Sequence, residues 1–185
     1  VSIIPSGVVG VLFDDWMDAH LHTSTVVAAM LIVYGVAFLL VERRYQGRHL
    51  AVSDVDHMDW KTAVGIGLFQ CLSLIPGTSR SGSTILGGIL LGASRSAAAE
   101  FSFFMAIPTM LGASGIKLLK FFMTGVGFAG PEIAVLLVGC AVSFLVSLLV
   151  IRGLMNYVRN HSFSAFGVYR IVLGILVLAY FAIAK

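Results

Sequence analysis

The sequence has 185 residues, of which 58% are hydrophobic and only 11% are charged, and its mean hydropathy is +0.98. This composition excludes a water-soluble globular domain and indicates a single membrane domain over residues 1–185. The formal net charge is +3, and the basic residues stand singly or in pairs at the ends of apolar segments. That placement favours an orientation signal in a lipid membrane over a nucleic-acid surface, so we expect membrane lipids and no nucleic acid as partners.

The first residues, 1–12, form an apolar stretch without an initiator methionine, a charged leader or a cleavage site. The stretch has the character of the last part of a longer helix. We therefore expect residues 1–185 to be the later part of a longer protein, or one chain of a split protein. Residues 13–23 follow with three aspartates and Trp16, and are predicted to form a polar connection at a membrane surface.

Four later segments are apolar and approach the ~20 helical residues that cross a ~30 Å hydrocarbon core. These predicted spans are residues 24–41, 98–119, 132–151 and 163–183. Loops or turns are predicted between them, at residues 45–59, 124–131 and 156–161. The predicted fold class is therefore an all-α polytopic helical bundle in a membrane.

Residues 61–95 do not fit this pattern of simple spans. At ~20 residues per crossing, the segment is too long for one span and too short for two. Pro76 and Gly77 divide it, because proline lacks the N–H that a helix needs and glycine is entropically costly in a helix. We predict two half-helices that fold back on each other as a re-entrant hairpin.

The distribution of basic residues supports re-entry. If the hairpin enters and leaves by one membrane face, most of the basic residues that flank the spans lie on the cytoplasmic side, as the positive-inside rule requires. The cytoplasmic set is then Arg43, Arg44, Arg48, Lys61, Arg95, Arg152 and Arg159, and the outer set is Lys117, Lys120 and Lys185. A single crossing would make the distribution nearly even.

The polar residues after the break suit an anion. The second half-helix is expected to begin near Gly82 to Ile85, and its N-terminus would direct unpaired N–H groups and the positive end of the helix dipole toward the break. Arg80 lies just before it and carries planar donors that fit phosphate oxygens. An arginine at membrane depth costs ~2.5–3.5 kcal/mol or more, so we predict a phosphate or other anion here. The alternative is a loop that packs by hydrogen bonds and presents Arg80 to solvent.

The stretch around the break resembles a known family. Residues 67–113 read GLFQCLSLIPGTSRSGSTILGGILLGASRSAAAEFSFFMAIPTMLGA. They are similar to the PGxSRSG signature and its surroundings in the undecaprenyl-diphosphate phosphatase family, also called the bacitracin-resistance or BacA/UppP family. FGVYRIVLG at residues 166–174 and the order of the spans agree more loosely, so the resemblance covers the whole chain.

This resemblance implies a bacterial enzyme that removes the terminal phosphate of undecaprenyl diphosphate and returns the lipid carrier to cell-wall synthesis. It also implies an inverted-topology repeat in which two re-entrant hairpins meet at the active site. Arg80 would hold the diphosphate and stabilise charge on the transferred phosphoryl group. The other residues implied are, for catalysis, Ser79, Ser81 and Thr84, and for substrate binding, Gly77, Thr78, Gly82, Ser83 and Gln70.

The family's first motif is not found in this sequence. It supplies paired acidic residues, implicated in binding a divalent metal such as Mg or Ca and in acid–base chemistry, and a histidine from an SSTGH-type stretch. The glutamates, Glu42, Glu100 and Glu132, lack that spacing, and all the histidines fall in predicted loops, namely His20, His22, His49, His57 and His161. We therefore expect residues 1–185 alone to be inactive, with the first repeat supplied by missing sequence or by a partner chain.

The sequence leaves two interpretations open for each of three polar residues. Gln70 either contacts a ligand or metal, or packs within the hairpin. Glu100 either faces the site as a metal or proton-handling group, or pairs with Arg95 or caps its helix. Arg170 either snorkels to the cytoplasmic face or pairs in a buried position. A phenylalanine-rich set is expected to face lipid or pack in the core, rather than to form a prenyl-binding groove: Phe101, Phe103, Phe104, Phe121 and Phe122.

The predicted function is thus a lipid diphosphate phosphatase, multi-pass in the bacterial inner membrane, with its site open toward the outer face and a homodimer left open. The alternative is a membrane transporter or lipid flippase, because inverted repeats with broken helices are also a transporter scaffold. A purely structural membrane subunit would leave Arg80 without a role.

Overall fold

A computed structural model describes residues 1–45, 52–125, 127 and 130–183, and the regular elements in that part of the chain are all helices. Two basic residues used in the charge argument, Arg48 and Lys185, lie outside the described residues, as does His49. The α-helices are α1 (Ile4–Leu21), α2 (Ser24–Tyr45), α3 (Trp60–Cys71), α4 (Arg80–Leu90), α5 (Arg95–Met123), α6 (Gly130–Asn160) and α7 (Ser164–Ile183). Short 3₁₀ turns occupy Val55–His57 and Leu72–Leu74.

Four of these helices are long and apolar enough to cross a membrane. They are α2, α5, α7 and the part of α6 that runs over Gly130–Val158. The predicted all-α polytopic class is confirmed, and the predicted spans coincide with these helices, except that the last one, residues 163–183, begins one residue before α7.

Two predicted connections are wrong. Residues 13–23 are not a polar connection, because α1 continues to Leu21, and residues 156–161 are not a turn, because α6 continues to Asn160. Both segments are polar, but neither contains a glycine or proline before the helix ends. Polarity ends the membrane-spanning part of a helix, whereas only a break in backbone geometry ends the helix itself.

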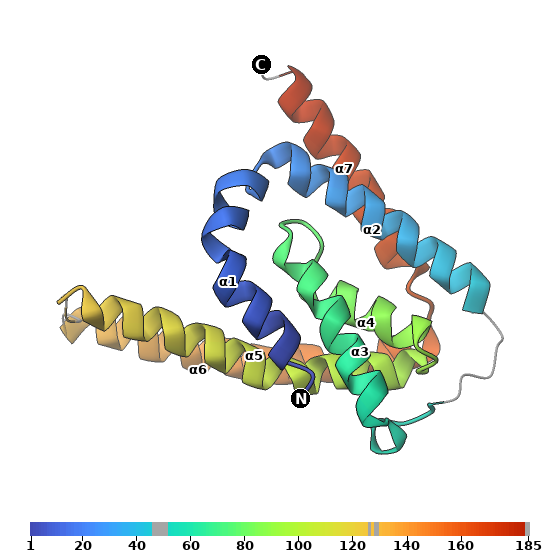
Figure 1. Cartoon of the computed structure of the whole chain (residues 1–185), viewed down its shortest axis with the longest axis horizontal. Coiled ribbons are helices and arrows are strands. Elements are labelled where there is room, and N and C mark those ends of the chain that lie inside the picture. The colour runs from blue at the N-terminus through green and yellow to red at the C-terminus, as the bar shows by residue number, and fades with distance from the viewer. Residues whose placement is uncertain (46–51, 126, 128–129, 184–185) are drawn as a thin grey trace.

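Helices α2 and α7 pack tightly against each other in antiparallel directions (Figure 1). A Cβ atom added at Gly35 would lie 2.7 Å from the carbonyl oxygen of Gly167, and one added at Gly174 would lie 2.9 Å from that of Ala28. Small residues let the backbones of membrane helices approach closely. Such packing matters in a membrane, because lipid gives no hydrophobic driving force for two helices to associate. This contact fixes the position of every side chain that α7 presents to the centre of the fold.

The helices on either side of the break, α3 and α4, form an antiparallel pair. Gly87 of α4 contacts Phe69, and Leu91, just after α4, contacts Gly65, so the numbering rises along one helix as it falls along the other. Residue Val52 bridges to Ala93, which brings the chain before α3 next to the chain after α4. The two half-helices predicted from Pro76 and Gly77 are therefore present, and re-entry from one membrane face stays a prediction.

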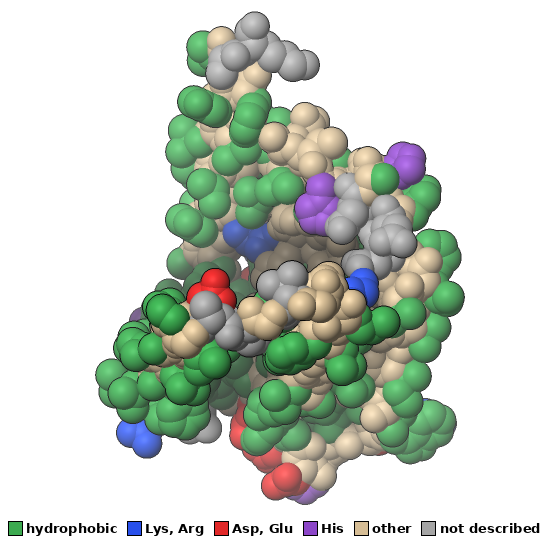
Figure 2. All heavy atoms as spheres, turned by 90° about the vertical axis from the view of Figure 1, so that its left-hand side faces the viewer, with side chains coloured by type: hydrophobic (Ala, Val, Ile, Leu, Met, Phe, Trp, Pro, Cys, Tyr) green, Lys and Arg blue, Asp and Glu red, His purple; other side chains and the backbone are tan. Residues whose placement is uncertain are grey.

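The remaining helices surround this pair. Helix α1 runs beside α3 in the same direction, with Gly10 next to Leu74 and Ser6 bonded to Gln70. Helices α5 and α6 lie along each other and extend away from the other helices (Figure 1). No residue in the apolar window of α6 is buried, and one face of the molecule is covered mostly by hydrophobic side chains (Figure 2). Such a surface suits contact with lipid tails.

Gly35→Ala tests the α2–α7 contact. The added methyl group meets the carbonyl oxygen of Gly167 at 2.7 Å, so the two helices must separate. We expect a loss of ~1–3 kcal/mol in the free energy of unfolding, measured by denaturation in detergent micelles. The matched control is Gly139→Ala in α6, where an added Cβ has no atom within 4 Å. Equal stability of the two variants would contradict the role of this contact.

Candidate active site

The chain between α3 and α4 makes a tight turn that prepares the start of α4. Gly77 has φ of +90°, and a Cβ there would lie 2.5 Å from the carbonyl oxygen of Val27. Ser79 also has a positive φ, +70°, which is uncommon for a residue with a side chain. Its hydroxyl caps α4 by accepting a hydrogen bond from the N–H of Gly82 at 3.3 Å. This cap explains why α4 begins at Arg80, two residues before the expected start near Gly82.

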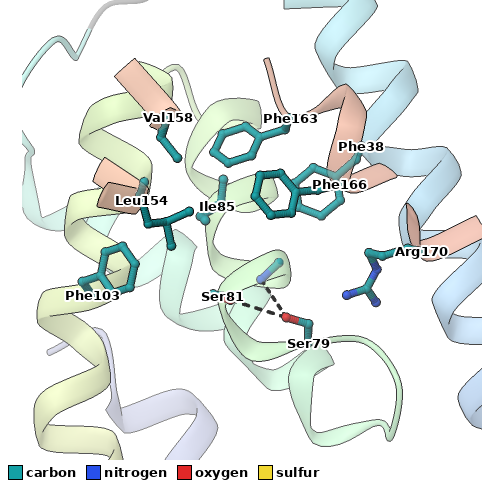
Figure 3. Close-up of a pocket in the computed structure, with 12 residues that line it drawn as sticks. Phe38, Ser79, Ser81, Ile85, Phe103, Leu154, Val158, Phe163, Phe166 and Arg170 are labelled. Atoms are coloured by element: carbon teal, nitrogen blue, oxygen red, sulfur yellow. Dashed lines mark hydrogen bonds between the residues drawn. The ribbon is translucent and has the colours of Figure 1, made fainter. Parts of the chain in front are cut away.

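A pocket of about 180 Å³ opens beside this helix start. One part of its lining is polar and contains Ser79, Ser81, Gly82 and Arg170. The rest is apolar and comes from five helices and the α6–α7 connection, through Phe38, Ile85, Ala99, Phe103, Leu154, Val158, Phe163 and Phe166. Figure 3 shows the aromatic and aliphatic side chains gathered on one side, with Ser79 and Arg170 apart from them.

Arg170 reaches from α7 to the turn before α4. Its Nη2 donates hydrogen bonds to the carbonyl oxygens of Gly77, at 2.6 Å, and Thr78, at 2.9 Å. Its guanidinium also lies over the ring of Tyr34, 5.8 Å from the centroid. Of the two interpretations left open by the sequence, the structure supports pairing, in a partly buried position and with main-chain carbonyls as the partners of Nη2, while Nε is buried without an acceptor among the described residues. Sequence reasoning did not place Arg170 at the site, although a single arginine inside the apolar α7 was a signal.

Arg80 is the first residue of α4 and is not among the residues that line the pocket. Its side chain is partly buried, and its Nη1 atom is fully buried with no hydrogen-bond acceptor among the described residues. A buried guanidinium N–H without an acceptor is costly. The start of α4 therefore carries an unused cationic donor.

Three of the hydroxyl groups in the motif are used within the protein. Thr78 donates to the carbonyl of Ile75 at 2.8 Å, and the hydroxyl of Ser83 lies 3.0 Å from that of Tyr34, which accepts from it. Thr84 lies 2.7 Å from the hydroxyl of Ser102 in α5. All three residues are 0% exposed and none of them lines the pocket. The structure thus brings Ser79, Ser81 and Gly82 together at the pocket and packs Thr78, Ser83 and Thr84 behind it.

Gln70 lies away from the pocket, in the contact between α3 and its neighbours. It is 1% exposed, and its amide nitrogen donates to the hydroxyls of Ser6 in α1 and, at 3.5 Å, Thr109 in α5. The amide nitrogen therefore packs within the protein, whereas the amide oxygen is buried without a hydrogen-bond partner among the described residues.

Glu100 does not pair with Arg95, because Arg95 forms its ion pair with the buried Glu42. Within the described residues, no three His, Cys, Asp or Glu side chains lie close enough to hold a metal ion. The prediction that the histidines lie in loops is wrong for His20, which lies inside α1. The described residues therefore offer a helix start with a cationic side chain beside it and an apolar wall, but not a metal site by themselves.

This arrangement suits a molecule with an anionic head and an apolar tail. The N-terminus of α4, with its cap and the guanidinium nearby, favours negative charge. The aromatic and aliphatic lining favours hydrocarbon. Of the phenylalanine-rich set, only Phe103 lines this pocket.

Comparison with known proteins identifies a matching family and several similar relatives. The family model described as "Bacitracin resistance protein BacA" matches residues 1–176. Relatives named undecaprenyl-diphosphatase include a protein of Enterococcus faecalis, 56% identical over 99% of this chain, and one of Streptococcus mutans serotype c, 57% identical over 97%. Undecaprenyl-diphosphatase 1 of Clostridioides difficile is 56% identical over 98%. The chain spans 64–65% of the length of these relatives.

Thr84→Val tests whether the buried hydroxyl pair joins α4 to α5. The change leaves the hydroxyl of Ser102, 2% exposed, without its partner, so we expect a loss of ~0.5–2 kcal/mol in the free energy of unfolding. The double variant Thr84→Val with Ser102→Ala should lose less than the sum of the single losses, as measured in a double-mutant cycle. Thr124→Val, on the exposed end of α5, is the control. Strictly additive losses would contradict the pairing.

Proposed function

Because this chain belongs to the bacitracin resistance protein BacA family, we propose that the protein containing it hydrolyses undecaprenyl diphosphate to undecaprenyl phosphate and inorganic phosphate. The reaction returns the lipid carrier to bacterial cell-wall synthesis. The observation that carries the proposal is the pocket at the start of α4, which combines a polar end with an apolar wall. An amphipathic lipid diphosphate needs both.

In this proposal the diphosphate lies at the polar end of the pocket. Ser79 and Ser81 supply hydroxyl donors there, and Gly82 allows the backbone of α4 to approach the phosphate oxygens closely. The first N–H groups of a helix have no partners within that helix and point toward its N-terminus. They and the helix dipole complement the charge of the phosphate, as at other phosphate-binding helix starts.

Arg80 is the proposed electrostatic catalyst. Phosphoryl transfer proceeds mainly by positioning and by stabilising charge on the transferred group. Arg80 does not line the pocket itself, but its chain neighbours Ser79 and Ser81 do, so the proposal requires its guanidinium to turn toward the bound phosphate. A phosphate oxygen would then give Nη1 the acceptor that it lacks among the described residues. The binding of the anion and the burial of this guanidinium then stabilise each other.

The apolar part of the pocket would take the first isoprene units of the substrate. Phe103 of α5, Leu154 of α6 and Phe166 of α7 lie around it, and Figure 3 shows their side chains on one side of the α4 start. Since the outer faces of α5 and α6 are also apolar, the rest of a long prenyl chain can continue into the lipid.

A divalent metal such as Mg or Ca does not fit the described residues alone, because they bring no three acidic or histidine ligands together. The proposal is that the acidic ligands and the groups that activate water come from sequence outside residues 1–185 or from a partner chain. The protein is multi-pass in a membrane, and we propose the bacterial inner membrane, with the site open toward the outer face.

Arg80→Ala should reduce phosphate release from undecaprenyl diphosphate by at least ~100-fold in the full-length protein, because one donor to the developing charge is lost. Phosphate release in detergent micelles measures this. Arg80→Lys should keep part of the activity, since an ammonium retains the charge but not the planar pair of donors. Arg152→Ala, on the exposed face of α6, is the control. Wild-type turnover in Arg80→Ala would remove the assignment, and lipid movement without phosphate release would favour a flippase.

Residues 1–185 expressed alone should bind detergent and fold as helices but release no phosphate. The physical reason is that the described residues contain no cluster of acidic or histidine ligands at the pocket. Circular dichroism checks the fold, and phosphate release from undecaprenyl diphosphate checks the activity. Turnover by this segment comparable with that of the full-length protein would show that the segment carries the whole catalytic apparatus.

A further inference from the structure

We infer that Arg170 is a positioning residue, which holds the turn before α4 in the shape that binds the substrate. The inference rests on the proposed function, because the turn matters for catalysis only if the phosphate binds at the start of α4. Arg170 lies in α7, and the turn that it contacts lies more than ninety residues earlier in the chain.

The hydrogen bonds of Arg170 fix two consecutive peptide groups. The peptide between Gly77 and Thr78 is held at both ends, because its carbonyl accepts from Arg170 and its N–H donates to the carbonyl of Ile75 at 3.3 Å. The next peptide, between Thr78 and Ser79, is held through its carbonyl at 2.9 Å. Since a trans peptide is planar, fixing its carbonyl also fixes the direction of its N–H.

The turn needs this restraint because its backbone is strained. Ser79 has a φ of +70°, which side-chain-bearing residues rarely adopt, and such conformations persist only where the surroundings enforce them. Relaxation of Ser79 would move its hydroxyl away from the N–H of Gly82, and the cap of α4 would be lost. Ser79, Ser81 and Gly82 would then no longer face the pocket as a set.

Arg170 is itself held in place from two sides. Its guanidinium stacks over Tyr34 of α2, whose hydroxyl accepts from Ser83 of α4. One residue away on each helix, a Cβ at Gly35 would lie 2.6 Å from the side chain of Ile171, which shows how closely α2 and α7 approach. The close contact between α2 and α7 therefore fixes the position of the guanidinium, and the turn before α4 is held by its hydrogen bonds to that group.

A positioning residue and a residue that contacts the substrate directly affect different kinetic parameters. A residue that contacts the phosphate equally before and during reaction alters KM, whereas a residue that aligns other groups alters kcat. Misplacement of about 1 Å can cost about 100-fold in rate. We therefore expect Arg170→Met to lower kcat about 100-fold and to change KM less than about threefold.

The test compares Arg170→Met, Arg170→Lys and the control Arg152→Met in the full-length protein, with two measurements. The first is kcat and KM for phosphate release from undecaprenyl diphosphate. The second is hydrogen–deuterium exchange at the amides of residues 77–82, with the amides of α2 as a check on folding. We expect faster exchange at residues 77–82 in Arg170→Met, partial restoration of exchange and kcat in Arg170→Lys, and no change in Arg152→Met.

Unchanged exchange at residues 77–82 in a folded Arg170→Met protein would overturn the inference, as would a rise in KM with kcat preserved. If Arg170→Met does not fold, Arg170→Lys decides, because one ammonium replaces the paired donation and should still give a lower kcat and faster exchange. If the wild-type protein releases no phosphate, the proposed function is wrong. The effect of Arg170 on the turn can still be tested in that case, because hydrogen–deuterium exchange at residues 77–82 does not depend on turnover.

Discussion

A broken helix in apolar surroundings must satisfy its backbone polar groups from elsewhere in the protein, and this requirement organises the structure. Pro76 has no N–H to satisfy, and Ser79 caps the following helix. The carbonyls of Gly77 and Thr78 accept from Arg170. The break can therefore exist only where α7 brings a guanidinium to it, so the position of α7 is a condition for the site.

The position of α7 depends in turn on the close contact with α2. Glycines on both helices remove the side chains that would separate the two backbones. The same contact places Tyr34 under the guanidinium of Arg170 and its hydroxyl against Ser83 of α4. Helices α2, α4 and α7 thus meet around one polar cluster, and the apolar residues of the pocket pack beside it.

The sequence predicted the break and the four apolar helices because proline, glycine and hydropathy act locally. It misplaced the ends of α1 and α6, since polar residues such as those before Leu21 do not stop a helix. It also assigned every hydroxyl of the motif to catalysis or to substrate binding. In α4, positions four residues apart share a face, so Ser81 and Ile85 line the pocket while Thr84, on another face, packs against α5. Arg170 was missed because no local pattern connects residues so distant in sequence.

The two arginines near the start of α4 each keep one buried donor without an acceptor among the described residues, Nη1 in Arg80 and Nε in Arg170, but only Arg170 bonds to the turn. Arg170 donates to two carbonyls of the protein, which partly replace the water that a charged group would have in solution. Arg80 keeps a buried Nη1 without a described acceptor. A helix N-terminus already carries partial positive charge, so two guanidinium groups beside it are unfavourable unless negative charge is supplied. The two carbonyls compensate the charge of Arg170 only in part, so an anionic ligand beside this helix start would complement both guanidinium groups.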